Sequence, residues 1–224
     1  MSTVAVLPVK RFSEAKQRLA RSGLSAAWRR ALAEAMVTDV LVALRRVNAI
    51  DATVVVTAEP IAMRLAEGHD AALIKDRLED GQSAAALLGI EHAISGGAQR
   101  VLLVPGDCPA VDPRELEALL DSAPGAGVTI VPDRHGTGTN ALLLSPADVL
   151  APAFGPDSFA RHRTSAQTTG VPARVAHVPS LALDVDTGDD LATLDATLAR
   201  CRGGAAHTRG TLAQLNRLAM AGAA

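Results

Sequence analysis

Short apolar runs alternate with longer helical stretches along this chain, and this alternation constrains the fold more than any other feature. Runs suited to buried strands occupy residues 4–9, 53–57, 71–74, 100–104, 128–131, 140–144, 174–178 and 181–185. Helix-sized stretches lie near residues 25–47, 59–67, 83–94 and 158–167, and others begin near residues 112 and 187. Strands that alternate with helices form a mostly parallel, doubly wound sheet with helices on both faces. The pattern therefore predicts an α/β/α sandwich.

Several helix starts can be predicted from single residues. Asp112, Pro113 and Glu115 have the spacing of an N-cap, a first helical residue and a reciprocal capping carboxylate. Ser25 and Ser83 are predicted N-caps of two other helices, because a serine oxygen can accept a free N–H of the first turn.

Length and composition allow one large globular domain or two small ones, and we expect one. The 224 residues are 48% hydrophobic, which is enough for a single well-buried core. We expect residues 1–200 to form this domain. Residues 201–224 follow it through a Gly-Gly-Ala-Ala segment, and we expect a tail that is weakly helical or partly disordered.

Charge and composition also exclude several function classes. A formal net charge of −2 and an aromatic content of 2% argue against a nucleic-acid partner. No apolar run approaches the roughly 18 residues of a membrane span, and the N-terminus lacks a signal-peptide pattern. Cys108 and Cys201 have no metal-ligand spacing, which argues for a reducing compartment and against a disulfide or zinc scaffold. We expect a cytoplasmic protein with a small-molecule partner.

The residues with chemical potential follow the predicted strands. In doubly wound sheets the ligand crevice lies beyond the carboxyl ends of the strands. Lys10 follows the first strand and opens a stretch, residues 10–18, that contains four cations, among them Lys16 and Arg18. Lysine and arginine in such a loop favour binding of a triphosphate. The alternative is a basic surface turn.

Three carboxylates could hold a divalent cation in the same crevice. Asp107 lies in a tight turn after the fourth strand, and Asp184 and Asp186 would point to the same side of the last strand. Carboxylates together with substrate phosphates are typical ligands of Mg²⁺. Alternatively, Asp107 is a turn residue and Asp186 a carboxylate at a helix entry.

Residues 132–140 contain two glycines and two threonines, and Arg134 supplies a permanent charge. Such a loop suits a phosphate, because glycine lets main-chain N–H groups approach an anion closely. A plain connecting loop is the alternative. Further along, a helix that begins near Ser158 would offer free N–H groups to an anionic acceptor. His162 in that helix is more often structural than catalytic.

Other common catalytic patterns are absent from the sequence. There is no Walker motif, which disfavours the P-loop class, and no Gly-x-Gly-x-x-Gly after the first strand. No arrangement of Ser-His-Asp or Cys-His type is evident, and Cys108 before a proline is expected to serve packing.

Taken together, these segments resemble the guanylyltransferases of coenzyme F420 biosynthesis. The resemblance covers about residues 4–199, and its most specific parts are Gly-Thr-Gly-Thr-Asn at residues 136–140 and Phe-Gly-Pro-Asp-Ser at residues 154–158. It implies a single-domain nucleotidyltransferase fold, Rossmann-like and GT-A-like. It also implies an enzyme that joins GTP to a small phosphorylated three-carbon acid, phosphoenolpyruvate or 2-phospho-L-lactate.

The resemblance further implies roles for individual residues. It assigns Mg²⁺ to Asp107, Asp184 and Asp186, and the GTP phosphates to Lys10, Lys16 and Arg18. It assigns the acceptor to Thr139, Gly155 and Ser158. It places base or ribose contacts at Gly81 and Ser83, but this chain departs from the family there. Where the family usually has Gly-Leu-Asn-x-Ala, residues 81–85 have a serine, which can still donate a hydrogen bond but is shorter than asparagine.

Two other functions stay open at this point. The same scaffold could carry another nucleotidyl transfer, to 3-phosphoglycerate, a molybdopterin or a cytidylyl acceptor, or it could bind a nucleotide without catalysis. Related enzymes suggest a monomer or a homodimer.

Overall fold

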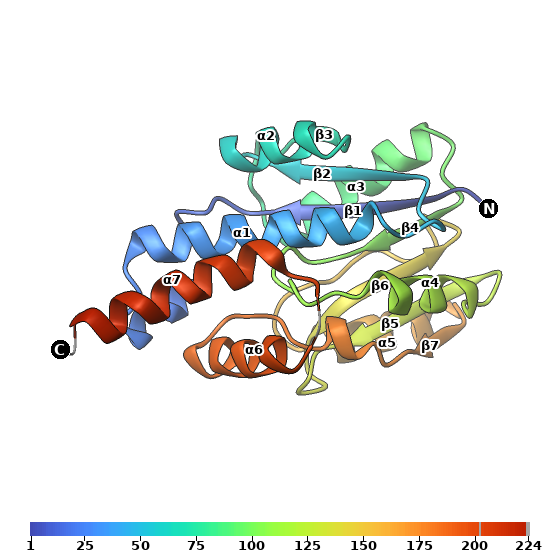
Figure 1. Cartoon of the computed structure of the whole chain (residues 1–224). Coiled ribbons are helices and arrows are strands. Elements are labelled where there is room, and N and C mark those ends of the chain that lie inside the picture. Colours follow the sequence, from blue (N-terminus) through green and yellow to red (C-terminus); the bar gives the residue numbers. More distant parts are fainter. Residues whose placement is uncertain (202, 223–224) are drawn as a thin grey trace.

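A seven-stranded sheet forms the centre of the computed structural model, which describes residues 1–201 and 203–222 (Figure 1). The strands are β1 (Thr3–Val9), β2 (Ala52–Thr57), β3 (Ala72–Lys75), β4 (Arg100–Leu103), β5 (Gly127–Pro132), β6 (Thr139–Ser145) and β7 (Ala173–Val175). Their order is β3-β2-β1-β4-β6-β5-β7. Only β6 runs antiparallel to its neighbours β4 and β5, so the predicted mostly parallel sheet is confirmed.

Helices cover both faces of this sheet. They are α1 (Ala26–Leu44), α2 (Pro60–Gly68), α3 (Gln82–Ser95), α4 (Pro113–Asp121), α5 (Ser158–Thr169), α6 (Gly188–Arg200) and α7 (Ala206–Gly222), with 3-10 turns η1 (Gln17–Ser22) and η2 (Pro179–Leu181). Helices α1, α2 and α4 pack on one face, and α3 and α5 on the other. The expected α/β/α layering is therefore present.

Alternation along β1 explains why the sheet needs helices on both sides. Ala5 and Leu7 belong to the core cluster beneath α1, whereas Val4 and Val6 belong to the cluster beneath α3. Successive side chains of a strand point to opposite faces, and here both sets are apolar and buried. A strand with this pattern is stable only at the centre of a three-layer fold.

Helix α3 approaches β1 unusually closely through Gly89. A Cβ atom at this position would lie 2.3 Å from Val6 Cγ1 and 3.1 Å from Val56 Cγ2. Only a residue without a side chain fits here at the observed helix-to-sheet distance.

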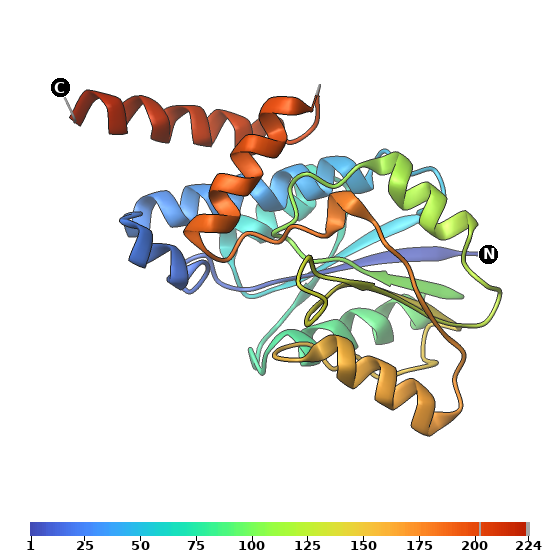
Figure 2. The ribbon, with the colours of Figure 1, turned by 90° about the horizontal axis from the view of Figure 1, so that it is seen from below.

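The C-terminal helices form a third cluster on the outer side of α1. Figure 2 shows α7 beyond α1, on the side away from the sheet. Leu212 of α7 is buried in a cluster that also contains Met36 of α1 and Leu198 of α6. The Asp39 carboxylate of α1 accepts the N–H groups of His207 and Thr208 at 3.1 and 2.7 Å, and so caps the start of α7. No helix in the described part of the chain combines the length and apolarity needed to cross a membrane.

The predicted strand at residues 181–185 is wrong. The structure has a 3-10 turn that ends at Leu181, and the chain that follows has no regular secondary structure up to α6. Its alternating burial mimics a strand, because Leu181, Leu183 and Val185 are buried while Asp184 between them is less so. No strand of the described residues pairs with it, however, and Val185 N–H donates to the main-chain carbonyl of Asp107 at 3.2 Å instead. Strand β7 is likewise shorter than the predicted 174–178.

Two of the predicted capping roles are also wrong. The N-cap of α3 is Gly81, and Ser83 lies within the first turn, where its hydroxyl accepts the N–H of Phe154 at 2.8 Å. Asp112 caps α4 as expected, but the Glu115 carboxylate accepts the N–H of Ser180 at 2.9 Å instead of closing a reciprocal box. In both cases the side chain that local spacing assigned to a helix cap accepts a hydrogen bond from a residue distant in sequence instead. The predicted cap at Ser25 is confirmed.

Candidate active site

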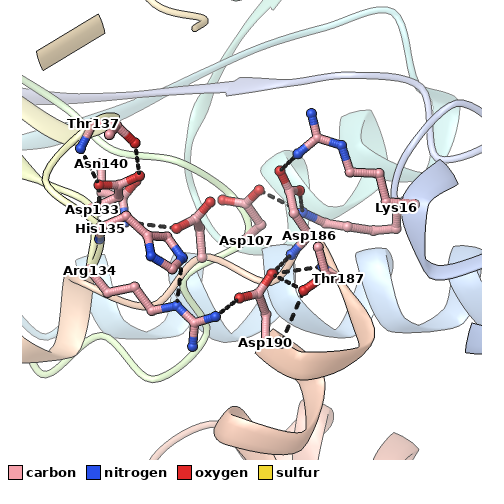
Figure 3. A network of polar contacts seen from close by, with 12 residues as sticks. Lys16, Asp107, Asp133, Arg134, His135, Thr137, Asn140, Asp186, Thr187 and Asp190 are labelled. Carbon is pink, nitrogen blue, oxygen red and sulfur yellow. Dashed lines mark hydrogen bonds and ion pairs between the residues drawn. The ribbon is translucent and has the colours of Figure 1, made fainter. Parts of the chain in front are cut away.

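A buried lysine joins two of the predicted site carboxylates. Lys16 lies between β1 and η1 in the left-handed backbone region, with φ of 58°, and its side chain is 7% exposed. Its Nζ lies 2.6 Å from Asp107 Oδ2 and 3.0 Å from Asp186 Oδ1 (Figure 3). Burial alone would lower the pKa of Lys16, but the charges of Asp107 and Asp186 outweigh it and raise the pKa above its usual value. Lys16 is therefore a permanent cation.

The third predicted carboxylate, Asp184, is held beside this pair. Asn140 at the start of β6 donates through Nδ2 to Asp184 Oδ1 at 3.2 Å and to the carbonyl of Leu181 at 2.7 Å. Burial raises the pKa of Asp184, and the charge of Asp107 adds to that rise. Burial is the larger of the two causes, and the nearby charge of Asp107 is the part of the pKa shift that a bound cation would offset.

The three carboxylates come together by a different route from the one predicted. Asp184 and Asp186 do not share one face of a strand, because their segment is irregular. The bond between Val185 and the Asp107 carbonyl holds this segment against the turn after β4. Among the residues that the structure describes, no three acidic, histidine or cysteine side chains form a ready-made metal cage. The Lys16 ammonium is shared by Asp107 and Asp186, whereas Asp184 bonds Asn140.

The other residues predicted to bind phosphate, Lys10 and Arg18, lie less close to the carboxylates than Lys16 does. Arg18 is exposed, and its guanidinium lies 3.6 Å from Asp186. Lys10 is exposed directly after β1. Arg11 between them forms a two-pronged ion pair with Glu79 at 2.7 to 3.0 Å, which joins the β1 loop to the loop before α3. Sequence reasoning had not assigned a role to this pair.

The glycine loop between β5 and β6 is organised around its own carboxylate. Asp133 accepts the N–H groups of His135 and Thr137 at 3.1 and 2.9 Å, so these donors are already used inside the loop. A Cβ at Gly138 would lie 2.8 Å from Asp133 Oδ2. The glycine at this position is thus required for the approach of Asp133, a reason that the sequence pattern did not indicate.

Arg134 connects this loop to the start of α6. Its guanidinium forms an ion pair with Asp190 (Figure 3). It also donates to Thr193 Oγ1 at 3.3 Å. Asp190 Oδ2 in turn accepts the N–H groups of Asp186 and Thr187 at 3.1 and 2.7 Å. Burial by itself would raise the pKa of Asp190, but these hydrogen bonds and the Arg134 charge lower it overall. The Arg134 charge, which the sequence analysis assigned to a phosphate, is therefore paired with a carboxylate of the protein.

A second cluster gathers the predicted acceptor ligands. Thr139 N–H donates to Ser158 Oγ at 2.9 Å, and both side chains are buried. Ser158 N–H donates to the carbonyl of Gly155, whose φ of +113° favours glycine. His162 contacts Thr139 Oγ1 through Nδ1 at 3.0 Å, a contact that sequence reasoning missed because the two residues lie on different elements.

The two clusters meet at the beginning of β6. Thr139 belongs to the cluster with Ser158, and the next residue, Asn140, bonds Asp184 of the carboxylate cluster. Because β6 runs antiparallel to β4, its first residues lie at the same sheet edge as the carboxyl end of β4. Ser83 adds α3 to the second cluster through its bond to Phe154. Of the predicted residues, Gly81 stays apart as the α3 N-cap.

Comparison with solved structures defines the class to which this fold belongs. A nucleotidyl transferase from Methanothermobacter matches with a TM-score of 0.66 and 22% identity, covering 89% of this chain and 98% of that chain. A CMP:2-keto-3-deoxy-manno-octonic acid synthetase complexed with CTP matches with a TM-score of 0.61 and 15% identity, over 89% and 99% of the two chains. At these identities the likeness concerns the fold alone, which is that of nucleotidyltransferases.

Sequence comparison then gives the family. The chain belongs to the family described as guanylyl transferase CofC like, whose model matches residues 3–210. A phosphoenolpyruvate guanylyltransferase from Conexibacter woesei is 55% identical over 97% of this chain and 98% of its own length. One from Sphaerobacter thermophilus is 40% identical over 87% and 93%. The family resemblance drawn from the sequence motifs is confirmed, and the chain is a guanylyltransferase-family enzyme.

Proposed function

We propose that this chain transfers the guanylyl group of GTP to phosphoenolpyruvate, releasing pyrophosphate, as a step of coenzyme F420 biosynthesis. The observation that carries the proposal is the meeting of the two clusters at the start of β6. A cluster of cations and carboxylates suits a nucleoside triphosphate, and the adjoining hydroxyl pair suits a small anionic acid. Near-full-length similarity to relatives that bear this name supports the choice of substrates.

Asp107, Asp184 and Asp186 would hold Mg²⁺ in this proposal. Their donor set fits, because carboxylate oxygens are the ligands that Mg²⁺ prefers. When bound, the ion would neutralise charge that develops on the triphosphate. Lys10, Lys16 and Arg18 would bind the triphosphate oxygens, and Lys16 would exchange part of its contact with the carboxylates for the nucleotide.

Thr139, Gly155 and Ser158 would bind the acceptor, with Arg134, Gly81 and Ser83 shaping the surrounding loops. An oxygen of the acceptor phosphate would attack the α-phosphorus of GTP in line. The new P–O bond would form as the bond between the α-phosphorus and the bridging oxygen breaks, and pyrophosphate would leave with that oxygen. A phosphate monoester is already an anion near neutral pH, so positioning and charge neutralisation suffice without a strong general base.

The cellular setting in this proposal follows from composition and family. We place the enzyme in the cytoplasm, as a monomer or homodimer with small-molecule substrates, without a nucleic-acid or membrane partner. A formal net charge of −2 gives a polyanion no general attraction, so the anion sites must be local.

An acceptor panel tests this proposal directly. Purified protein would be mixed with GTP, Mg²⁺ and either phosphoenolpyruvate, 2-phospho-L-lactate or 3-phosphoglycerate, with CTP as the alternative nucleotide. Mass spectrometry would identify the diphosphate-linked product, and a coupled assay would follow pyrophosphate. We expect turnover with GTP and phosphoenolpyruvate above that of the other pairs. Pyrophosphate release with none of them would support a noncatalytic nucleotide-binding module instead.

A further inference from the structure

His162 occupies a fully buried position on α5 between two partners. Its Nδ1 lies 3.0 Å from Thr139 Oγ1, and its Nε2 accepts the main-chain N–H of Ala153 at 2.8 Å. Its ring also meets the ring of Phe154 edge to face, with centroids 5.3 Å apart. Both ring nitrogens therefore have a defined hydrogen-bond partner, and the ring cannot turn over without losing one of them.

These partners fix the position of the imidazole proton. A main-chain N–H can only donate, so Nε2 must accept and carry no proton. Burial, with a smaller contribution from the Arg161 charge, lowers the pKa of His162 to about 4, which keeps the ring neutral near pH 7. The single proton of a neutral imidazole then lies on Nδ1. Thr139 Oγ1 consequently accepts from the ring, and the main-chain carbonyl of Ser158, one helical turn earlier, is a second acceptor that opposes part of the pKa shift.

The direction of this bond decides how the Thr139 hydroxyl can act. Its oxygen accepts from His162, which directs its own hydrogen to another partner. Ser158 is in the same condition, because its Oγ accepts the N–H of Thr139. Within residues 1–201 and 203–222, neither hydroxyl has an acceptor for its hydrogen. Two buried hydroxyls whose hydrogens are free to donate match an anionic oxygen.

We propose that His162 is a positioning residue that holds the Thr139 hydroxyl as a hydrogen-bond donor to an anionic oxygen of the acceptor acid. This proposal rests on the proposed function, in which Thr139 and Ser158 bind that acid. His162 itself does not touch the substrate. It acts by orienting one hydroxyl, so a change at His162 should alter the binding of the acceptor acid and leave the binding of GTP unchanged.

Two amide substitutions separate this role from a structural one. In His162→Asn the amide nitrogen takes the place of Nδ1 and can still donate to Thr139, whereas in His162→Gln the amide oxygen takes the place of Nε2 and can still accept from Ala153. We expect His162→Gln to raise the KM for phosphoenolpyruvate about tenfold, the size of a lost hydrogen bond to a charged group. We expect His162→Asn to stay within about threefold of the wild type, and the KM for GTP to be little changed in both.

A double-mutant cycle with Thr139→Val adds a second criterion. If His162 acts through the Thr139 hydroxyl, His162→Gln will raise the KM for phosphoenolpyruvate no further once that hydroxyl is gone. Thr139→Ser, which keeps the hydroxyl, serves as the control. Equal effects of the two amides, an additive cycle or an equal rise in the KM for GTP would each overturn the positioning role while leaving the proposed function standing.

A measurement on the wild-type protein tests the proposal even if the variants do not fold. Nitrogen NMR of labelled histidine is expected to show His162 as the neutral tautomer with its proton on Nδ1, and a proton on Nε2 would overturn the proposal. A wild type that transfers no guanylyl group to any acceptor of the panel would instead refute the proposed function, and the role of His162 with it.

Discussion

At the scale of single residues, the site depends on buried charges and hydroxyls whose partners come from distant parts of the chain. Lys16 is the clearest case, because its ammonium pairs with carboxylates 91 and 170 residues away. A buried cation of this kind is tolerated only while it is paired. The same side chains therefore contribute to the stability of the protein as well as to its proposed chemistry.

Asp107→Asn tests both contributions of this ion pair. Since the variant keeps the shape but loses the charge, we expect kcat to fall about 100-fold or more, as for the loss of a metal ligand. Without Mg²⁺ the free energy of unfolding should fall by only about 1–2 kcal/mol, because Lys16 keeps Asp186. Kinetics and urea denaturation would measure the two effects. The exposed Asp189→Asn is the control, and activity near that of the control would contradict the role of Asp107.

His162 predicts a pH dependence of stability. Its folded pKa of about 4 lies below the usual value of about 6.5, so the unfolded chain takes up the proton first as the pH falls. The contribution is fully present above about pH 6.5 and is lost as the pH falls through the folded pKa, in total roughly 3 kcal/mol. Urea denaturation between pH 7 and pH 4 should show a shallower loss for His162→Gln than for the wild type, and parallel curves would speak against this account.

At the scale of elements, the close contact of α3 with the sheet limits what the helix can carry. Gly89 lies over Val6 and Val56, both in the fully parallel half of the sheet. The N-terminal turn of the same helix carries Ser83, which holds the main chain at Phe154 near the second cluster. A displacement of α3 would therefore reach the loop before α5.

Gly89→Ala is expected to destabilise the protein although alanine favours helices. The added Cβ would lie 2.3 Å from Val6 Cγ1, so α3 must move away from the sheet, at a cost of about 1–3 kcal/mol. Thermal and urea denaturation would measure this loss. Gly96→Ala at the C-cap of the same helix meets only ordinary contacts from 3.4 Å upwards and is the matched control. A stability equal to that of the control would show that the helix can shift freely.

Helices and strands were predicted correctly where hydrophobic periodicity and local caps determine them. They were mispredicted where hydrogen bonds to distant residues determine the structure. The periodicity of α1 and the cap at Ser25 are local signals, and both are confirmed. Residues 181–185 alternate in burial like a strand, but a strand also needs a neighbour for its ladder, and here Val185 bonds the Asp107 carbonyl. The roles of Asp133 and His162 likewise depend on contacts that spacing alone does not encode.

At the scale of the whole molecule, the segment after α6 is integrated into the structure and not merely attached to it. The start of α7 is capped by the buried Asp39 of α1, and Leu212 lies in the cluster with Met36 and Leu198. Sequence analysis had expected a weakly helical or partly disordered tail, because the segment's amphipathic pattern is faint. The helix is held by its contacts with α1, and these cannot be inferred from the sequence of the tail alone.

Leu212→Ala tests this integration. Removing a side chain that is 5% exposed should lower the free energy of unfolding by about 2–4 kcal/mol and make the chain beyond Arg200 easier to cleave by protease. Denaturation curves and limited proteolysis would measure both effects. The exposed Gln214→Ala on the same helix is the control, and an equally stable Leu212→Ala protein would show that α7 contributes little to the fold.

The reversed direction of β6 has a consequence for how enzymes on this scaffold can diversify. A hairpin joins β5 to β6, so two strand ends and the turn between them, residues 133–138, lie together beside the proposed site while the strands stay fixed in the sheet. Changes in the length or composition of that turn can alter the surroundings of the proposed acceptor residues without altering the hydrophobic interior. We expect differences in acceptor choice among relatives to concentrate in this turn and in the loop before α5.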